Sequence, residues 1–188
     1  MRRRNTKVYI SGALLLSIFF NVVLVTLLFT QEPVYIETII REEVIVEVKE
    51  ELPPLTEEQL INSYILDISS IYNVDPYLID SIIYHESRHI PTAKNGNCLG
   101  LMQVCTTWHM DRAEKLGVKD FYDPYGSILL GVDYISELLD STDGDVTLTL
   151  MLYNMNHKQA YSMHAKGEVS WYASSVLKRV EDLKQGVK

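Results

Sequence analysis

The chain has 188 residues and a formal net charge of −8, which allows one domain and an additional segment. The first 30 residues hold four basic side chains and no acidic one, so the rest of the chain carries 13 basic residues against 25 acidic ones. This excess of acids argues against a nucleic-acid partner, because a basic surface is needed to displace the counterions of a phosphate backbone.

The N-terminus has the pattern of a membrane anchor. Residues 1–7 form a basic tail, and residues 8–29 are uncharged and mostly apolar. A run of about 22 such residues can span a bilayer as a helix, and the basic residues before it keep the N-terminus cytoplasmic. A cleaved signal peptide is the alternative, but the run is long for one and no small-x-small site ends it. We therefore expect a single-pass transmembrane anchor with the remaining chain outside the cytoplasm.

Residues 30–55 are expected to link this anchor to a domain. Val44, Val46 and Val48 alternate with acidic residues, and Pro53 and Pro54 follow. The alternation fits a strand, but a run of like charges ending in prolines also fits an extended, self-repelling stalk. Pairing with a second copy is a further possibility that the pattern leaves open.

Residues 56–188 carry the periodicity of a compact helical domain. Thr56 and Gln59 form a predicted capping box, and Asp75 followed by Pro76 begins a second helix that Pro91 is expected to stop. Further helices are predicted over about 108–116, from Pro124 onward, over about 146–153 and over about 170–183, because apolar residues recur there three and four apart. The turn-forming residues 95–97 precede a short predicted hairpin at about 99–104.

Glu86 is the candidate catalytic residue. It follows Leu78, Ile79, Ile82 and Ile83 at helical spacing, so its carboxyl lies on the stripe that faces the core. Burial raises the pKa of a carboxyl, which keeps it protonated and able to donate a proton. The chemistry that this favours is cleavage of a glycosidic bond.

A different enzyme class is suggested by His85, Glu86 and His89, which match the H-E-x-x-H pattern of zinc proteases. Pro91 places the second histidine on a helix end, and no third ligand stands out, whereas catalytic zinc needs three protein ligands. The sequence therefore predicts no metal site, and the two histidines are interpreted as helix-end residues.

A set of short motifs occurs in a fixed order across the domain. The chain has Glu86-Ser87, then Pro91-Thr92-Ala93, Gly100-Leu101-Met102-Gln103, Asp123-Pro124, a helix with Ile128, Gly131 and Tyr134, and finally Tyr153-Asn154. Over about residues 60–183 this order resembles the lytic transglycosylase domain of the SLT type, which is related to goose-type lysozyme. The resemblance implies a mainly α, lysozyme-like α+β fold with one small hairpin.

The resemblance also implies a mechanism without a cofactor. Glu86 would protonate the glycosidic oxygen between N-acetylmuramic acid and N-acetylglucosamine in peptidoglycan. It would then take a proton from the C6 hydroxyl of the muramoyl sugar, which closes into a 1,6-anhydro ring. A second carboxylate is not needed when the substrate supplies the nucleophile, whereas ordinary glycosidases use a pair.

The remaining site residues are assigned by the same resemblance. Ser87 is expected near Glu86 and the glycan, Met102 and Gln103 are expected to line the cleft, Tyr153 to lie over the catalytic carboxyl, and Asn154 to fix the local turn or touch sugar. Simpler roles are a core position for Met102, a helix-end hydroxyl for Ser87 and a C-cap for Asn154. Cys98 and Cys105 are candidates for a disulfide outside the membrane, or for two small buried apolar residues.

Three alternatives to the transglycosylase remain: a goose-type lysozyme that uses water, a glycan-binding module of low activity and, more remotely, the zinc protease. The second is suggested by Asn97-Cys98 and Asn156, which replace residues of the family pattern that are Gly-Ala and Gly. The anchor and stalk suit a cell with one membrane and a thick wall, where such an enzyme would remodel the wall or open it for a secretion or conjugation apparatus.

Overall fold

The computed structural model describes residues 53–187. The predicted basic tail, the anchor over residues 8–29 and most of the predicted linker lie outside the described residues. Between residues 53 and 187, no helix has both the length and the apolar character needed to cross a membrane. The residues from Leu55 to Lys188 form one compact unit.

Side-chain caps determine where the first two helices begin. Helix α3 (Glu57–Tyr72) starts at the predicted capping box, in which the Gln59 N–H donates to the Thr56 side chain and the Thr56 N–H donates to Gln59 Oε1. It ends at Asn73, whose left-handed backbone turns the chain. Helix α4 (Pro76–Ser87) starts after Asp75, whose carboxylate accepts the Tyr77 N–H at 2.9 Å. Both starts confirm the sequence prediction.

Helix α4 ends earlier than predicted, at Ser87 rather than next to Pro91. Arg88 and His89 both have positive φ, 56° and 60°, so the chain leaves the helix before Pro91 acts on it. The His89 ring then lies 2.8 Å from Asp80 through Nε2 and Oδ1. A proline restricts mainly the residue before it, which here is Ile90. The left-handed cap at Arg88 lies two residues before Ile90 and ends the helix there.

A small antiparallel sheet follows, with strand order β1-β2-β3. It consists of β1 (Lys94–Asn95), β2 (Cys98–Leu99) and β3 (Val104–Cys105). The predicted hairpin corresponds to β2 and β3, which are joined by residues 100–103, and β1 adds a strand that was not predicted. In the structure a disulfide joins Cys98 of β2 to Cys105 of β3, which are partners in the strand register.

The rest of the domain is helical. The chain continues through α5 (Thr106–Leu116), α6 (Pro124–Ser141), α7 (Val146–Asn154), α8 (His157–His164) and α9 (Trp171–Lys184). Helix α8 was not predicted, because only Ala160 of its residues is buried and its apolar pattern is weak. Asn156 caps it by accepting the Gln159 N–H at 3.3 Å.

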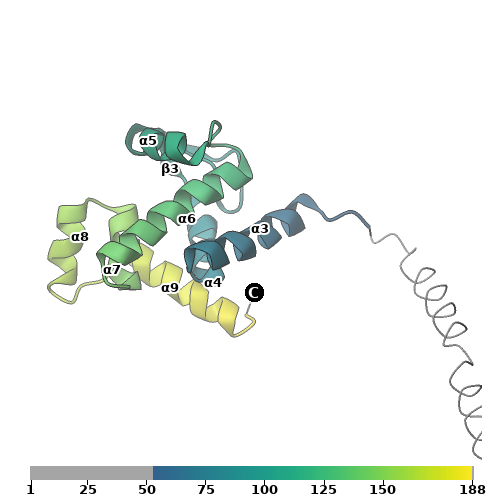
Figure 1. Ribbon diagram of the computed structural model, residues 1–188. Coiled ribbons are helices and arrows are strands. Elements are labelled where there is room, and N and C mark those ends of the chain that lie inside the picture. Colours follow the sequence, from purple (N-terminus) through teal and green to yellow (C-terminus); the bar gives the residue numbers. More distant parts are fainter. Residues whose placement is uncertain (1–52, 188) are drawn as a thin grey trace, which may run out of the picture. The chain divides into compact units, whose positions relative to one another are not determined.

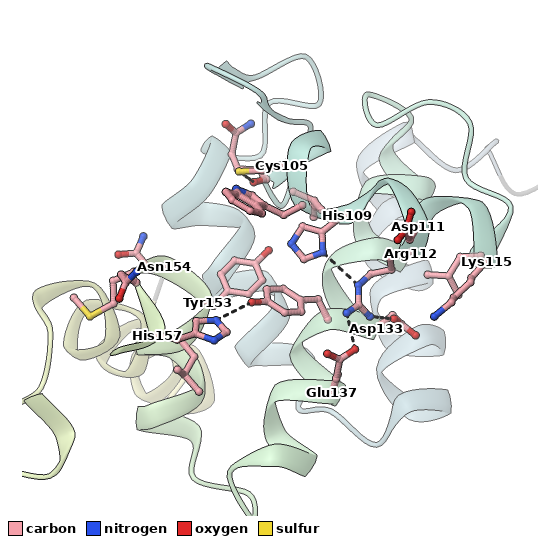
Figure 2. Close-up of a pocket in the computed structure, with 18 residues that line it drawn as sticks. Cys105, His109, Asp111, Arg112, Lys115, Asp133, Glu137, Tyr153, Asn154 and His157 are labelled. Atoms are coloured by element: carbon pink, nitrogen blue, oxygen red, sulfur yellow. Dashed lines mark hydrogen bonds and ion pairs between the residues drawn. The ribbon is translucent and has the colours of Figure 1, made fainter. Parts of the chain in front are cut away.

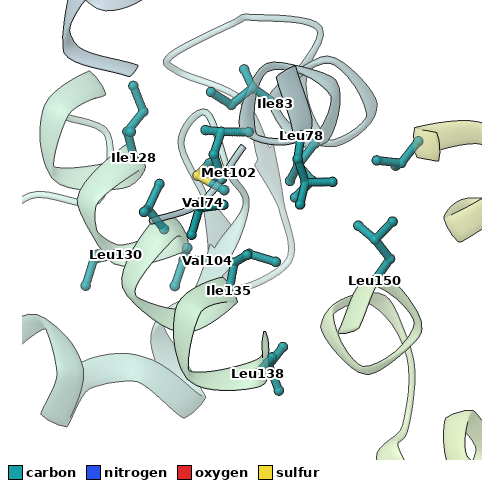
Figure 3. Close-up of a cluster of buried hydrophobic side chains, with 14 of the residues drawn as sticks. Val74, Leu78, Ile83, Met102, Val104, Ile128, Leu130, Ile135, Leu138 and Leu150 are labelled. Carbon is teal, nitrogen blue, oxygen red and sulfur yellow. The ribbon is translucent and has the colours of Figure 1, made fainter. Parts of the chain in front are cut away.

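The core lies where α4, α6, α7 and α9 pack together. Helix α6 runs through the middle of the unit, with α5 and the sheet toward one of its ends and α8 on the outside of α7 (Figure 1). Helix α9 packs against α4 and α7, and α3 packs against α4 and α6. Figure 3 shows buried side chains of α4, α6 and α7 together with Met102 and Val104. The fully buried side chains of the domain include Ile79, Ile82, Ile83, Met102, Leu130, Ile135, Leu150, Met151 and Val176.

Gly131 lets the sheet approach α6 closely, as its place inside a predicted helix suggested. A Cβ atom at this position would lie 2.3 Å from Met102 Sδ and 2.8 Å from Met102 Cβ. Real Cβ atoms do not come so close, so Met102 occupies the space that a side chain at residue 131 would need.

We expect Gly131→Ala to destabilise the domain by about 1–3 kcal/mol, because Met102 must move away from α6 in a fully packed interior. Urea unfolding of the purified chain measures this change. Asp140→Ala, at an exposed position of the same helix, is the control and should change stability by less than about 0.5 kcal/mol. Equal stability of Gly131→Ala and the wild type would contradict the close approach.

Candidate functional site

Glu86 sits in the last turn of α4 and is held from the opposite side by α9. The Tyr172 hydroxyl donates a hydrogen bond of 2.6 Å to Glu86 Oε1. Tyr172 is 8% exposed, so this contact is largely shielded from water. Hydrogen bonds to a carboxylate are stronger than those between neutral groups, and shielding strengthens them further. The carboxyl is therefore fixed by a residue 86 positions away along the chain.

Burial dominates the electrostatics of Glu86. Removal from water raises the pKa of this carboxyl above its usual value of 4.5, and the hydrogen bond from Tyr172 partly opposes that rise. Burial and the nearby Glu86 charge also raise the pKa of Tyr172, so its hydroxyl remains a donor at neutral pH. Burial thus makes the Glu86 carboxyl easier to protonate, and the hydrogen bond from Tyr172 fixes the position of its Oε1 atom.

The loop between β2 and β3 is built against α6 through its backbone. A Cβ atom at Gly100, where φ is 77°, would lie 2.1 Å from the Phe121 carbonyl oxygen. The Met102 N–H donates to Ser127 Oγ at 3.2 Å, and the Met102 carbonyl accepts from the Tyr153 hydroxyl at 2.8 Å. Only glycine fits at position 100, and the two hydrogen bonds of Met102 link the loop to α6 and α7.

A cavity of about 920 Å³ opens beside this loop. Gln103, Tyr153 and Asn154, three of the residues predicted for the site, line it together with side chains of α5 and α6. Figure 2 shows His109 and Arg112 on one side of Tyr153, and Asn154 and His157 on the other. Its size falls within the range of small-molecule sites.

The charges in the cavity largely neutralise one another. Arg112 forms ion pairs with Asp133 and, at 2.6 Å from its Nη2, with Glu137. Its guanidinium carbon lies 5.1 Å from the centre of the Tyr134 ring, and the His157 Nε2 lies 3.3 Å from the Tyr134 hydroxyl. The main cation of the cavity is therefore already paired within the protein.

Glu86 does not line this cavity, and the two features meet at Tyr153. Tyr153 lines the cavity, and its pKa is raised well above 10.0 by burial and then by the nearby charge of Glu86. A charge effect of this kind requires the carboxyl to lie close to the phenol. The cavity therefore adjoins Glu86, the candidate catalytic residue, through Tyr153.

Met102, Ser87 and Gln103 each use part of their side chain within the protein. The Met102 side chain is fully buried and does not line the cavity, because it fills the space left by Gly131. Ser87 is 5% exposed, and its hydroxyl donates to the Ile83 carbonyl at 3.1 Å rather than to Glu86. Gln103 lines the cavity, but its amide nitrogen is used within the loop, donating to the Ala93 and Gly100 carbonyls.

The H-E-x-x-H pattern does not form a helical pair of ligands. His85 lies on α4 with Nδ1 2.8 Å from the Ser81 carbonyl, whereas His89 lies beyond the end of the helix and contacts Asp80. A zinc protease of this class needs both histidines on one helical face. The fold of this segment therefore supports the interpretation of His85 and His89 as structural residues.

Sequence reasoning missed Tyr172, Trp108, His109 and Arg112 as residues of the site. Tyr172 carries no local signal, because its partner lies in a different helix far away in the sequence. Tyr134, which belongs to the motif order, packs against the core and also lines the cavity, with its ring centre 4.5 Å from that of His109. The alternation of charges in α5 and α6 was the one available hint of the Arg112 ion pairs.

Comparison with known proteins agrees with the motif order. The model of the family described as "Transglycosylase SLT domain" matches residues 63–168. The chain is 36% identical over 93 residues to a protein named "Transglycosylase" of Enterobacteria phage PRD1, covering 49% of this chain and 33% of that protein. It is 35% identical over 85 residues to the membrane-bound lytic murein transglycosylase E of Buchnera aphidicola, covering 41% of this chain and 38% of that protein.

A solved structure has the same fold. The crystal structure of an inactive mutant of the lytic transglycosylase Slt from Pseudomonas aeruginosa matches with a TM-score of 0.56 and 16% sequence identity. The match covers 66% of this chain and 24% of that one. The chain thus matches between about a quarter and two fifths of the length of these proteins, and the likeness concerns their shared domain.

The raised pKa of Glu86 makes the stability of the domain depend on pH. Ionising the carboxyl is less favourable in the folded than in the unfolded chain. The protonated carboxyl therefore contributes stability that is fully present below pH 4.5 and is lost as the pH rises through the pKa of the folded state. Glu86→Gln cannot ionise, and we expect its melting temperature to rise relative to wild type between about pH 4 and pH 7. Thermal unfolding across this range measures the difference.

The control for this experiment is Glu114→Gln, an exposed carboxyl of α5. Its difference from wild type should vary less with pH than that of Glu86→Gln. If the Glu86→Gln difference stayed constant or shrank as pH rose, the carboxyl would not have the raised pKa that its burial implies.

Proposed function

The chain belongs to the transglycosylase SLT domain family, and we propose from this membership that it cleaves peptidoglycan glycan strands as a lytic transglycosylase, with Glu86 as its single acid and base. The observation that carries the proposal is the partly buried Glu86 carboxyl with its raised pKa and its 2.6 Å hydrogen bond from Tyr172. A carboxyl of this kind starts the reaction protonated, as proton donation to a leaving group requires.

The proposed reaction uses one carboxyl twice. Glu86 gives its proton to the glycosidic oxygen of the N-acetylglucosamine leaving group while the bond from that oxygen to C1 of the muramoyl sugar breaks. The C6 hydroxyl oxygen of the same sugar then bonds to C1, and its proton passes to the Glu86 carboxylate. The acid is restored, and the product is a 1,6-anhydro end.

The surroundings of Glu86 support a mechanism with one carboxylate. Within residues 53–187, burial and the Tyr172 hydrogen bond are the two causes behind its pKa, and no second acid contributes. Retaining and inverting glycosidases place two carboxyl groups about 5–9.5 Å apart across the scissile bond. A substrate hydroxyl as nucleophile removes the need for the second one. The goose-type lysozyme, in which water replaces that hydroxyl, remains an outcome of the test below.

Tyr172 is proposed as the positioning residue of this acid. Its hydroxyl leaves Glu86 one oxygen, Oε2, for the proton that is donated, and fixes the plane of the carboxyl. Tyr153 would cover the carboxyl from the cavity side, with its own hydroxyl bound to the Met102 carbonyl. Gln103 and Asn154 are proposed to contact the glycan from the cavity, since both line it. For Ser87 and Met102, which are buried, we propose a supporting role in the helix end and the loop.

We further propose that residues 8–29 anchor the chain in the cell membrane, with residues 1–7 in the cytoplasm and the catalytic domain of residues 56–188 outside it. The apolar run supports this, and the similar protein of Buchnera aphidicola is named membrane-bound. A cell with one membrane and a thick wall suits this plan. Local opening of the wall for a secretion or conjugation apparatus, or wall growth, would be its biological use.

The first test is digestion of purified peptidoglycan, with the products read by mass spectrometry. We expect the wild type to release muropeptides with 1,6-anhydro ends and Glu86→Gln to lose this activity by about 100-fold or more, because the proton donor is gone. Glu114→Gln serves as the control and should retain activity. Reducing ends in place of anhydro ends would indicate a lysozyme, and no products from a folded wild type would indicate a glycan-binding module.

A second test addresses Tyr172 through the pH dependence of kcat/KM. Because the protonated carboxyl is the active form, activity should fall as pH rises through the pKa of Glu86. Tyr172→Phe removes the hydrogen bond that lowers this pKa, so the alkaline limb should move to higher pH, and we expect kcat to fall about tenfold because the carboxyl is less well fixed. Tyr161→Phe, an exposed tyrosine of α8, should leave the profile unchanged. An unshifted limb in Tyr172→Phe would remove Tyr172 from the mechanism.

A further inference from the structure

Trp108 stands out among the residues of the cavity because it is large, aromatic and exposed to solvent. It lies in the first turn of α5 with 80% of its surface exposed, and it lines the cavity. The next residue, His109, has a non-helical backbone, with φ −124° and ψ 17°, so the helix is kinked where it presents the indole. Single exposed apolar residues are common on protein surfaces, but Trp108 is also one of the residues that line the cavity, where a ligand could cover it.

We propose that the Trp108 indole stacks on a sugar ring of the glycan strand, so that the cavity beside Tyr153 holds the sugars on one side of the bond that Glu86 cleaves. This inference rests on the proposed function and deepens it, because it assigns a binding residue outside the motifs and a direction for the bound strand.

The wall behind Trp108 is a continuous row of rings that leads toward Glu86. The His109 and Tyr134 rings lie 4.5 Å apart, and the Tyr134 and Tyr153 rings lie 5.5 Å apart. Tyr153 is in turn close enough to Glu86 to feel its charge. A pyranose ring has a flat face of C–H groups, which packs on aromatic faces of this kind. A strand placed along the row would therefore reach the catalytic carboxyl.

The cavity is lined by two cations, Arg112 and Lys115, and by three acids, Asp111, Asp133 and Glu137, so its formal charge of −1 disfavours a polyanionic ligand. Arg112 is paired with Asp133 and Glu137, so it is not free to bind an anion. Burial and the Arg112 charge lower the pKa of His109, which leaves its imidazole neutral at neutral pH. Gln103, Asn154 and Asn156 add amide groups to the lining. Amides and aromatic faces suit hydroxyl and acetamido groups, whereas a phosphate polymer would need unpaired cations.

The size of the cavity agrees with an oligosaccharide. A volume of about 920 Å³ lies near the upper end of the range for sites that enclose small molecules. The rings of the wall already pack against one another at tilted angles, and the Arg112 ion pairs hold α5 against α6. Few side chains then lose conformational freedom when the sugar binds. Most of the free energy gained by covering the exposed indole is therefore available for affinity.

The sequence allows a residue-specific binding experiment because it contains only two tryptophans, Trp108 and Trp171. The double variant Glu86→Gln/Trp171→Phe of the full chain, kept soluble with detergent, has Trp108 as its single tryptophan and does not cleave the ligand. Titration with the N-acetylglucosamine tetramer should shift its fluorescence to shorter wavelength in a saturable manner, because the sugar covers the indole. Glu86→Gln/Trp108→Phe reports on Trp171 in the same titration.

A saturable change in Trp108 emission supports the proposal, whether or not Trp171 also responds. A response of Trp171 alone, or of neither residue, overturns it. If neither tryptophan responds, binding of the same tetramer is measured by calorimetry. Binding without a change in Trp108 emission would place the sugar elsewhere on the protein.

Kinetics on soluble glycan strands provide an independent readout. In the otherwise wild-type chain, Trp108→Ala should raise KM about tenfold and change kcat by less than about twofold, because stacking holds the substrate equally before and during the reaction. Trp108→Phe keeps an aromatic face and should recover much of the loss. Tyr161→Ala, an exposed aromatic residue outside the cavity lining, should behave as wild type. Because the Trp108 side chain is exposed, its replacement should leave the fold intact. An unchanged circular dichroism spectrum would then show that the higher KM does not come from misfolding.

The two proposals fail in different ways. If the wild type forms anhydro products while Trp108→Ala keeps a normal KM, the stacking role is wrong and the proposed function stands. If the wild type forms no products while Trp108 emission responds to the tetramer, sugar binding in the cavity stands and the cleavage proposal is wrong.

Discussion

The hydrogen bond between Tyr172 and Glu86 is the contact on which the proposed chemistry depends. A carboxyl on the core-facing side of α4 is poorly solvated, and an unpaired polar group there would destabilise the fold. Helix α9 supplies the partner and is aligned by a second polar link, in which Arg179 contacts Asp80 of α4 at 3.2 Å. The Arg179 guanidinium also lies 3.9 Å from the centre of the Tyr84 ring. Packing of α9 on α4 therefore sets the direction of the acid.

The loop of residues 100–103 contributes to the site mainly through its backbone. Gly100 and Gly131 permit close approach to neighbouring elements, and the Met102 N–H and carbonyl bind Ser127 and Tyr153. The Cys98–Cys105 disulfide joins the strands at either end of this loop. A rigid loop fixes Tyr153, and Tyr153 connects the acid to the cavity. The proposed function thus needs the loop for placement, while the proton transfers are assigned to Glu86 alone.

Two physically different regions make up the site. Around Glu86, burial raises the pKa of the carboxyl and one hydrogen bond tempers that rise. In the adjoining cavity, Arg112 is paired with two acids and aromatic rings line the wall. The first environment favours proton transfer, and the second favours a neutral, ring-shaped ligand. Under the proposed function, their meeting at Tyr153 would allow a glycan to be held by one region and cleaved at the other.

The sequence by itself determined the features that depend on neighbours within a few residues. Side-chain caps at Thr56, Asp75 and Asp145 set helix starts, and the apolar residues at helical spacing before Glu86 placed its carboxyl toward the core. The order of short motifs was sufficient for the family. Only the tertiary structure decided that Tyr172 holds Glu86, that Met102 fills the space at Gly131 and that the wall beside Trp108 is aromatic. These contacts join segments far apart in sequence, and which side chains meet is decided by how the helices pack rather than by local periodicity.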